Sequence, residues 1–177
     1  MVEGHQAVRH QDDRVKGPLA KIVSGGQTGV DRGALDAALQ AGFPCGGCAP
    51  MGRIAEDGVV PDCYPLSVLA KGGYEERTLQ NVLDSDGTAI FYRGELEGGT
   101  RLTAEYCQAH RKPCELLNAA RLTPEQSARE LLAFVAGHDI AVLNVAGPRA
   151  SKWPGAHEYA RSAIGLLLAT LAAAGKS

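Results

Sequence analysis

The alternation of short apolar segments with segments of helical period limits the fold of this chain more than any other feature. We expect strands at 21–24, 45–49, 88–92, 113–117 and 139–145. We expect one helix that follows the first strand and ends near 41, and four more at 74–83, 100–110, 124–136 and 156–174. The segment 139–145 (DIAVLNV) is almost continuously apolar, which is typical of a parallel sheet covered on both faces. The alternation therefore predicts an α/β fold, a Rossmann-like parallel sheet with helices on both faces.

Length and charge favour a single domain that does not bind nucleic acid. A chain of 177 residues is long enough to build one full core without disulfides. We expect a polar, mobile tail over 1–19 and one domain over 20–177. The net charge is −2, whereas nucleic-acid-binding domains are usually strongly basic.

Cysteine usage and hydropathy indicate a cytoplasmic protein. Five cysteines, an odd number, are typical of a reducing compartment. The first residues carry no apolar run for a signal peptide, and the longest apolar stretch, 163–175, is shorter than the roughly 20 residues of a membrane span. Beyond Ala163 the last helix is apolar on nearly every side. This pattern predicts burial all round and a homo-oligomer, a dimer or a tetramer, formed through that helix.

Three loops that follow predicted strands are rich in glycine, hydroxyl or basic residues. Such loops meet at the carboxyl edge of a parallel sheet, where ligands bind. The first joins a strand to a helix, so its backbone N–H groups are expected to bind an anion; it consists of Ser24, Gly25, Gly26, Gln27, Thr28, Gly29, Val30 and Asp31. The alternative is a helix cap made by Thr28 with Asp31 three residues later. A phosphate would be repelled by Asp31, which is expected to meet hydroxyls, a metal or a capped N–H group.

The second and third loops extend the same pattern. In the second, glycines and hydroxyls precede a helix, and the candidate phosphate ligands are Gly98, Gly99, Thr100 and Thr103. An ordinary turn with a helix cap is the alternative. The third loop follows 139–145 and supplies cationic and hydroxyl groups suited to an oxyanion; its candidates are Gly147, Arg149, Ser151 and Lys152, with His157 as a further cation. A solvated basic loop is the alternative there.

Other polar features are expected to be structural. The Cys45–Cys48 pair lacks the second pair of ligands that structural zinc needs, so we expect no metal site. Asp84 and Asp86 precede a strand, on the edge away from the three loops, and are expected to be turn residues. The segment 50–65 has neither helical nor strand period, and a loop of this length is usually functional or loose.

Together these motifs resemble the circularly permuted branch of the SLOG superfamily, whose members are named molybdenum carrier proteins. The resemblance covers roughly residues 20–174 and depends on SGGQTGVD at 24–31, PMGRIAEDG at 50–58, DSDGT at 84–88, GGTRLT at 98–103 and NVAGPR at 144–149. It implies a Rossmann-like fold and a nucleotide or nucleotide-like ligand. The superfamily also includes the lonely-guy phosphoribohydrolases, whose first strand, loop and helix resemble 142–174 of this chain. The chain thus resembles a circular permutation of theirs.

The resemblance implies a phosphorylated ligand, either molybdenum cofactor or a nucleotide, in a binding or carrier protein. It places Arg77 where the phosphoribohydrolases carry a catalytic arginine, and Thr103 where they carry a catalytic glutamate, which a hydroxyl cannot replace as a base. Arg53 and Arg77 are expected to close over the ligand. The alternative activity is hydrolysis of the N-glycosidic bond of a nucleoside monophosphate, by Arg77 with Glu56 or Asp57. A third alternative is a non-catalytic assembly module.

Overall fold

The computed structural model describes residues 18–176, which form a five-stranded parallel sheet with helices on both faces. The expected tail lies outside the described residues except for Pro18 and Leu19, and Leu19 is buried in the core, so the packed domain includes it. The strands of the sheet, in spatial order, are β2 (Cys45–Gly46), β1 (Lys21–Val23), β9 (Val142–Ala146), β7 (Gly87–Tyr92) and β8 (Cys114–Asn118). All four neighbouring pairs are parallel, which confirms the predicted fold class.

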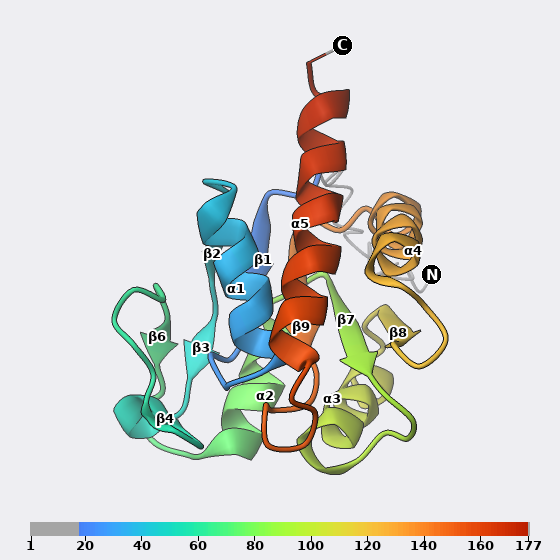
Figure 1. Ribbon diagram of the computed structural model, residues 1–177. Coiled ribbons are helices and arrows are strands. Elements are labelled where there is room, and N and C mark those ends of the chain that lie inside the picture. Colours follow the sequence, from blue (N-terminus) through green and yellow to red (C-terminus); the bar gives the residue numbers. More distant parts are fainter. Residues whose placement is uncertain (1–17, 177) are drawn as a thin grey trace, which may run out of the picture.

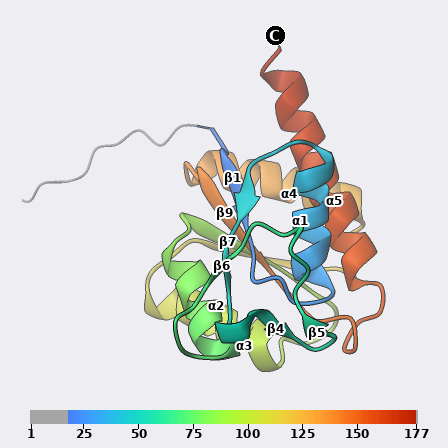
Figure 2. The same cartoon turned by 90° about the vertical axis from the view of Figure 1, so that its left-hand side faces the viewer.

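The helices form two layers around this sheet (Figures 1 and 2). One layer contains α1 (Val30–Gln40), α4 (Pro124–Gly137) and α5 (Ala156–Ala174); the other contains α2 (Tyr74–Leu83) and α3 (Gly98–Ala109). Small residues let α1 and α5 pack closely, since a Cβ atom on Gly33 would lie 2.3 Å from the carbonyl oxygen of His157. The last strand, β9, lies in the centre of the sheet, between β1 and β7.

The region between β2 and α2 is more ordered in its hydrogen bonding than its sequence suggests. The expected strand at 45–49 is divided at Gly47 into β2 and β3 (Cys48–Ala49), and β3 pairs with β6 (Ser67–Val68) in a separate sheet. The segment 50–65 is not a plain loop, because it contains a 3-10 turn, η1 (Met51–Arg53), and a hairpin of β4 (Ile54–Ala55) and β5 (Gly58–Val59). Ala55, Val60 and Tyr64 pack against Leu35 of α1 in a second, smaller core.

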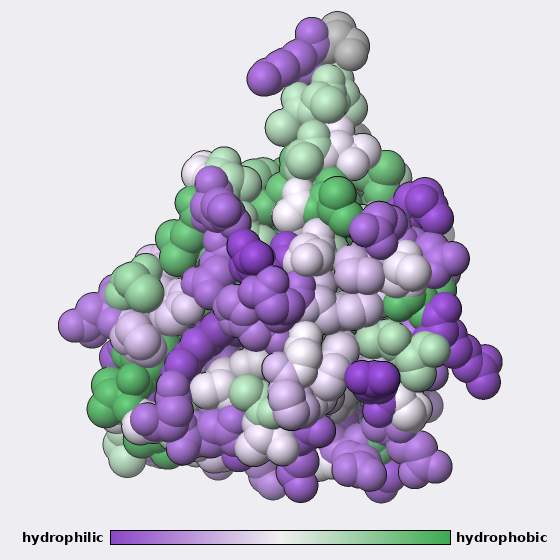
Figure 3. Space-filling model, viewed as in Figure 1, coloured by the Kyte–Doolittle hydropathy of each residue, from purple (hydrophilic) through white to green (hydrophobic). Residues whose placement is uncertain are grey.

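The end of α5 departs from the prediction of a helix buried all round. Ala163, Ile164, Leu167 and Leu168 are buried, but Leu166 is 39% exposed and most residues from 169 onward are exposed. This end projects past the rest of the domain (Figures 1 and 2), and its surface is largely apolar (Figure 3). Within residues 18–176, no helix combines the length and the apolar character needed to span a bilayer.

Candidate functional site

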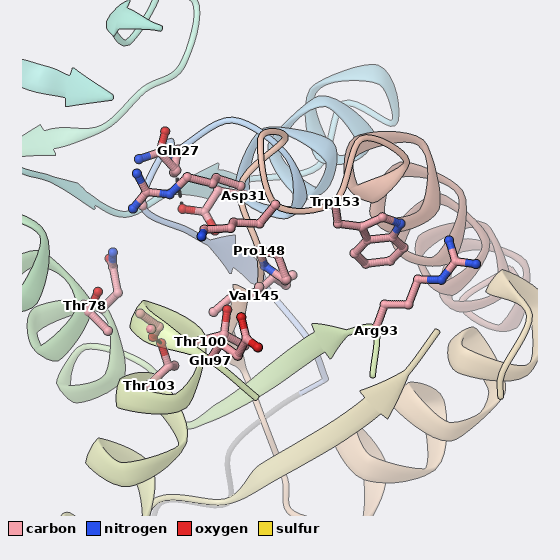
Figure 4. Close-up of a pocket in the computed structure, with 18 of the residues that line it drawn as sticks. Gln27, Asp31, Thr78, Arg93, Glu97, Thr100, Thr103, Val145, Pro148 and Trp153 are labelled. Carbon is pink, nitrogen blue, oxygen red and sulfur yellow. Dashed lines mark hydrogen bonds between the residues drawn. The ribbon is translucent and has the colours of Figure 1, made fainter. Parts of the chain in front are cut away.

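A cavity of about 660 Å³ lies at the carboxyl ends of β1, β9 and β7 (Figure 4). The β1–α1, β7–α3 and β9–α5 loops and helix α2 form its walls. The sequence-predicted residues that line it are Gly25, Gln27, Asp31, Arg77, Gly98, Gly99, Thr100, Thr103, Gly147, Arg149 and Lys152. The three loops singled out from the sequence therefore do meet at one pocket.

The β1–α1 loop is mostly satisfied by the protein's own groups. The alternative of a helix cap by Thr28 is wrong: the N-cap of α1 is Gly29, and the side-chain oxygen of Thr28 accepts the N–H of Ala150. Asp31 Oδ2 accepts the N–H of Gln27 at 3.2 Å, and the N–H of Val30 donates to the carbonyl of Pro148 at 3.2 Å. A carboxylate thus lies where an anion was expected, which agrees with the alternative in which Asp31 meets a capped N–H group.

Asp31 and Arg77 form a buried ion pair in the wall of the pocket. Arg77 Nη1 lies 3.5 Å from Asp31 Oδ2 and donates to the carbonyl of Gly25 at 2.9 Å. Burial raises the pKa of Asp31 above its ordinary value of 3.8, and the guanidinium of Arg77 offsets part of that rise. Gly25 makes room for this contact, because a Cβ atom there would lie 2.1 Å from Arg77 Nη1.

The α3 N-terminus offers unused backbone donors. Its helix begins at Gly98 with Glu97 as the N-cap, so both glycines belong to the first turn and Thr100 is not a cap. The N–H groups of Thr100 and Arg101 both donate to the carbonyl of Glu97, whereas those of Gly98 and Gly99 have no acceptor among the described residues. A Cβ atom on either glycine would meet nothing within 4 Å. An open helix start of this kind can bind an anion, and the expected phosphate contact at Gly98 and Gly99 stays a prediction.

The β9–α5 loop adds two cations to the pocket. Within residues 18–176 the exposed ammonium of Lys152 makes no hydrogen bond or ion pair. The guanidinium of Arg149 lies 5.4 Å from the ring centroid of Tyr74, and Arg77 lies 5.7 Å from the same centroid. The phenol ring at the start of α2 therefore holds both guanidinium groups at the pocket wall.

Glu56 links the loops behind the pocket. Its carboxylate accepts the side-chain hydroxyl of Thr28, and accepts the N–H and the hydroxyl of Ser151 at 3.1 and 2.5 Å. We call Glu56, Thr28 and Ser151 the loop clamp. Hydrogen bonding from the Ser151 hydroxyl and then from Thr28 lowers the pKa of Glu56 below its ordinary value of 4.5.

Several predicted site residues do not reach the pocket. The Ser24 hydroxyl donates to the carbonyl of Val145 at 2.6 Å, and Arg53 donates to the carbonyls of Val60, Pro61, Tyr64 and Leu66. His157 is bound to Asp36 at 2.6 Å. The other predicted residues outside the lining are Gly26, Thr28, Gly29 and Ser151. They shape the loops, and Arg53 organises the segment 50–65 rather than closing over the cavity.

The structure adds lining residues that the sequence analysis missed. They come from α2, from the segment after β7, from β9 itself and from the β9–α5 loop: Thr78, Asn81, Arg93, Glu95, Glu97, Asn144, Val145, Ala146, Pro148, Trp153 and Pro154. Arg93 and Glu95 directly follow β7, so their place after a strand was the available signal. In the view of Figure 4, Arg93 and Trp153 lie toward one end of the pocket, and Gln27 and Asp31 lie toward the other.

The remaining polar clusters do not form a metal site in the described part of the chain. Between Pro18 and Lys176, no group of three or more His, Cys, Asp or Glu side chains is placed to hold a metal ion. All five cysteines are free thiols. Asp86 accepts two backbone N–H groups at the start of β9, and Asp84 is the C-cap of α2, as expected of structural residues.

Comparison with known proteins finds relatives of this chain. The model of the circularly permutated YpsA SLOG family matches residues 22–168. The crystal structure, at 1.45 Å resolution, of "Putative molybdenum carrier protein" from Syntrophus aciditrophicus SB is similar, with a TM-score of 0.82 and 43% sequence identity. The similarity covers 85% of this chain and 95% of that chain. No curated protein matches the chain.

Proposed function

The chain belongs to the circularly permutated YpsA SLOG family, and from this premise and the chemistry of the pocket we propose that it binds and carries a phosphorylated heterocyclic small molecule. The ligand is molybdenum cofactor or a nucleotide, each of which combines a phosphate with a flat ring. The similar protein from Syntrophus aciditrophicus is named a molybdenum carrier, which supports the carrier role. The metal in such a ligand is cargo and needs no ligand set from the protein.

The observation that carries this proposal is the meeting of anion-binding groups with apolar surface in one cavity. The cavity is lined by Gly98 and Gly99, whose N–H groups have no acceptor among the described residues, and by Lys152, whose ammonium makes no ion pair there. Proline, valine and tryptophan side chains line other parts of it, as a flat ring requires. A volume of about 660 Å³ falls within the range of small-molecule and cofactor sites.

The charges of the lining residues agree with a ligand of modest negative charge. The cations that line the cavity are Arg77, Arg93, Arg149 and Lys152, and the carboxylates are Asp31, Glu95 and Glu97. The lining therefore has an excess of one positive charge. The pair of Asp31 and Arg77 is internally neutral. Backbone donors without an acceptor among residues 18–176 remain at the α3 end, where Glu97 is the N-cap but makes no side-chain cap hydrogen bond, and the phosphate is expected there.

Binding is favoured over hydrolysis of an N-glycosidic bond. Thr103, at the position that resembles the catalytic glutamate, donates its hydroxyl to the carbonyl of Gly99 at 2.8 Å. Glu56 belongs to the loop clamp, and Asp57 is bound to Arg32 at 2.6 Å. Neither carboxylate lines the cavity, so neither is placed to assist Arg77 at a ligand.

Thermal shift and calorimetry test the proposal. AMP, GMP, a pterin monophosphate and molybdate are titrated into the protein, and stabilisation by at least one phosphorylated ring is expected, about 2.7 kcal/mol at a hundredfold excess over the dissociation constant. Lys152→Ala weakens that binding, whereas Arg129→Ala, which removes an exposed charge on α4, leaves it unchanged. Failure of all four probes overturns the proposal. Release of free base from AMP that is abolished by Arg77→Ala establishes the hydrolase instead.

One observation favours an additional role in assembly. Leu166 of α5 is exposed, and the projecting end of this helix has a largely apolar surface. Exposed apolar area of this kind is buried when copies of a chain associate. We propose that this end mediates a homo-oligomer, which light scattering after size-exclusion chromatography tests directly.

A further inference from the structure

The side chain of Gln27 has a fixed orientation and an unused donor. Its Oε1 atom accepts the backbone N–H of Thr28 and of Glu56, each at 3.0 Å. The opposite assignment of the amide would point its NH₂ group at two N–H donors, so the position of Nε2 is determined by the contacts. Nε2 has no hydrogen-bond partner among the described residues, although Gln27 is only 6% exposed.

An unpartnered buried donor of this kind needs a reason. Leaving such a group unpaired costs roughly 1–3 kcal/mol, and buried polar groups in native proteins are nearly always bonded. Across residues 18–176, Nε2 of Gln27 is the buried side-chain nitrogen or oxygen that lacks a partner. Gln27 lines the cavity, so its missing partner is expected to come from the ligand.

The surroundings of Gln27 select a neutral acceptor rather than a phosphate. Asp31 lies beside Gln27 in Figure 4 and accepts its backbone N–H at 3.2 Å. A phosphate at this end would compete with that carboxylate for the guanidinium of Arg77. A carbonyl oxygen or ring nitrogen carries no net charge and does not compete in this way. The open helix start of α3 remains available for the phosphate.

We propose that Gln27 is the specificity-determining residue of this pocket, with its Nε2 atom donating to an acceptor on the heterocycle of the ligand. This inference rests on the proposed function and adds the orientation of the ligand, ring toward Gln27 and phosphate toward α3. Less than 1 Å² of Nε2 is accessible, so the groups that cover it must shift before the ring makes contact.

The test compares ring-bearing ligands with a ligand that lacks the ring. AMP, GMP, a pterin monophosphate and ribose 5-phosphate are titrated into wild type and Gln27→Glu. The glutamate retains an acceptor for the N–H groups of Thr28 and Glu56, but it buries a second carboxylate beside Asp31, so a melting temperature below that of wild type is expected. It has no donor for the ring, and binding of the preferred ring-bearing ligand is expected to weaken about tenfold more than that of ribose 5-phosphate.

The comparison between ligands separates recognition from added charge. Repulsion by the new carboxylate acts on the phosphate, which all four ligands share, and therefore cancels in the ratio. Gln27→Met, which adds no charge, is expected to give the same ratio with a lower melting temperature, because the two backbone N–H groups lose their acceptor. An unchanged ratio in both variants overturns the role of Gln27 while leaving the proposed function intact. Binding of no ligand by wild type refutes both.

Discussion

Removal of the Glu56 carboxylate tests whether the loop clamp holds the pocket together. In Glu56→Ala the N–H and hydroxyl of Ser151 and the hydroxyl of Thr28 all lose an ionised acceptor. Hydrogen bonds to charged groups contribute about 1.5–3 kcal/mol each, but both hydroxyls can turn to water once the carboxylate is gone. Glu56 is an exposed residue, so water screens these hydrogen bonds. We therefore expect a loss of about 1–2 kcal/mol in the free energy of unfolding, and a melting temperature lower by about 2–6 °C.

The pH dependence of this difference identifies its cause. The pKa of Glu56 is lowered in the folded protein, so its contribution is fully present above the ordinary value of 4.5 and is lost as the pH falls through the lowered value. The gap between wild type and Glu56→Ala is thus expected to be constant from pH 7 to about 5 and to shrink in more acid solution. The difference in the free energy of unfolding between the two proteins is measured at each pH by urea unfolding, followed by the fluorescence of Trp153, the single tryptophan.

A neighbouring carboxylate provides the control. Asp57 lies on the same hairpin and binds Arg32 through two hydrogen bonds of 2.6 and 2.8 Å, but its side chain is 49% exposed. Exposed ion pairs contribute little, and Asp57→Ala is expected to cost less than about 1 kcal/mol. The clamp interpretation is refuted if Glu56→Ala is as stable as Asp57→Ala, or if the gap to wild type is unchanged below the ordinary pKa of glutamate.

Three further changes have definite expected outcomes. Gly33→Val forces a side chain against the backbone of His157 and should lower the free energy of unfolding by about 1–3 kcal/mol. Gly165→Ala places its new Cβ atom where nothing lies within 4 Å, and should leave the free energy of unfolding equal or higher. Urea unfolding measures both, and the opposite ranking of the two variants refutes the packing of α1 on α5. Leu166→Glu should convert an oligomer to a monomer by light scattering, and a wild-type monomer would exclude assembly through α5. Asp86→Ala deprives two backbone N–H groups of β9 of their acceptor, and hydrogen exchange at those amides should increase without loss of ligand binding.

Periodicity was sufficient to predict the fold because each main element satisfies a local rule. The predicted range of α5 matches its observed bounds, and α4 begins with the expected proline after a Thr123 cap. The region 45–68 could not be predicted in this way, since its strands contain two residues each. Such short strands have no measurable period, and they are held by contacts far along the chain, such as that of Tyr64 with Asp36 at 2.7 Å.

The candidate site was predictable at the level of loops and not of individual groups. The position of the three loops directly after predicted strands was enough to locate the pocket. The hydrogen-bond partner of each polar group in these loops, however, comes from segments that are distant in the sequence. Thr28 resembles a helix cap in sequence and instead belongs to the loop clamp with Glu56. Arg53 resembles a ligand-binding cation and instead donates to four backbone carbonyls. No local pattern distinguishes these outcomes, because the competing acceptors are supplied by tertiary structure.

The two helix starts at the edge of the sheet are not equivalent, and this difference gives the pocket its direction. At α1 the protein supplies its own anion, since Asp31 accepts the N–H of Gln27 and is paired with Arg77. At α3 the first two N–H groups have no acceptor among the described residues. Glu97, the N-cap of α3, makes no side-chain cap hydrogen bond, so its carboxylate leaves these N–H groups open to a dianion. A ligand with one phosphate and one ring should therefore bind in a single orientation, and exchanging the open glycines for bulky residues should weaken ribose 5-phosphate as strongly as any nucleotide.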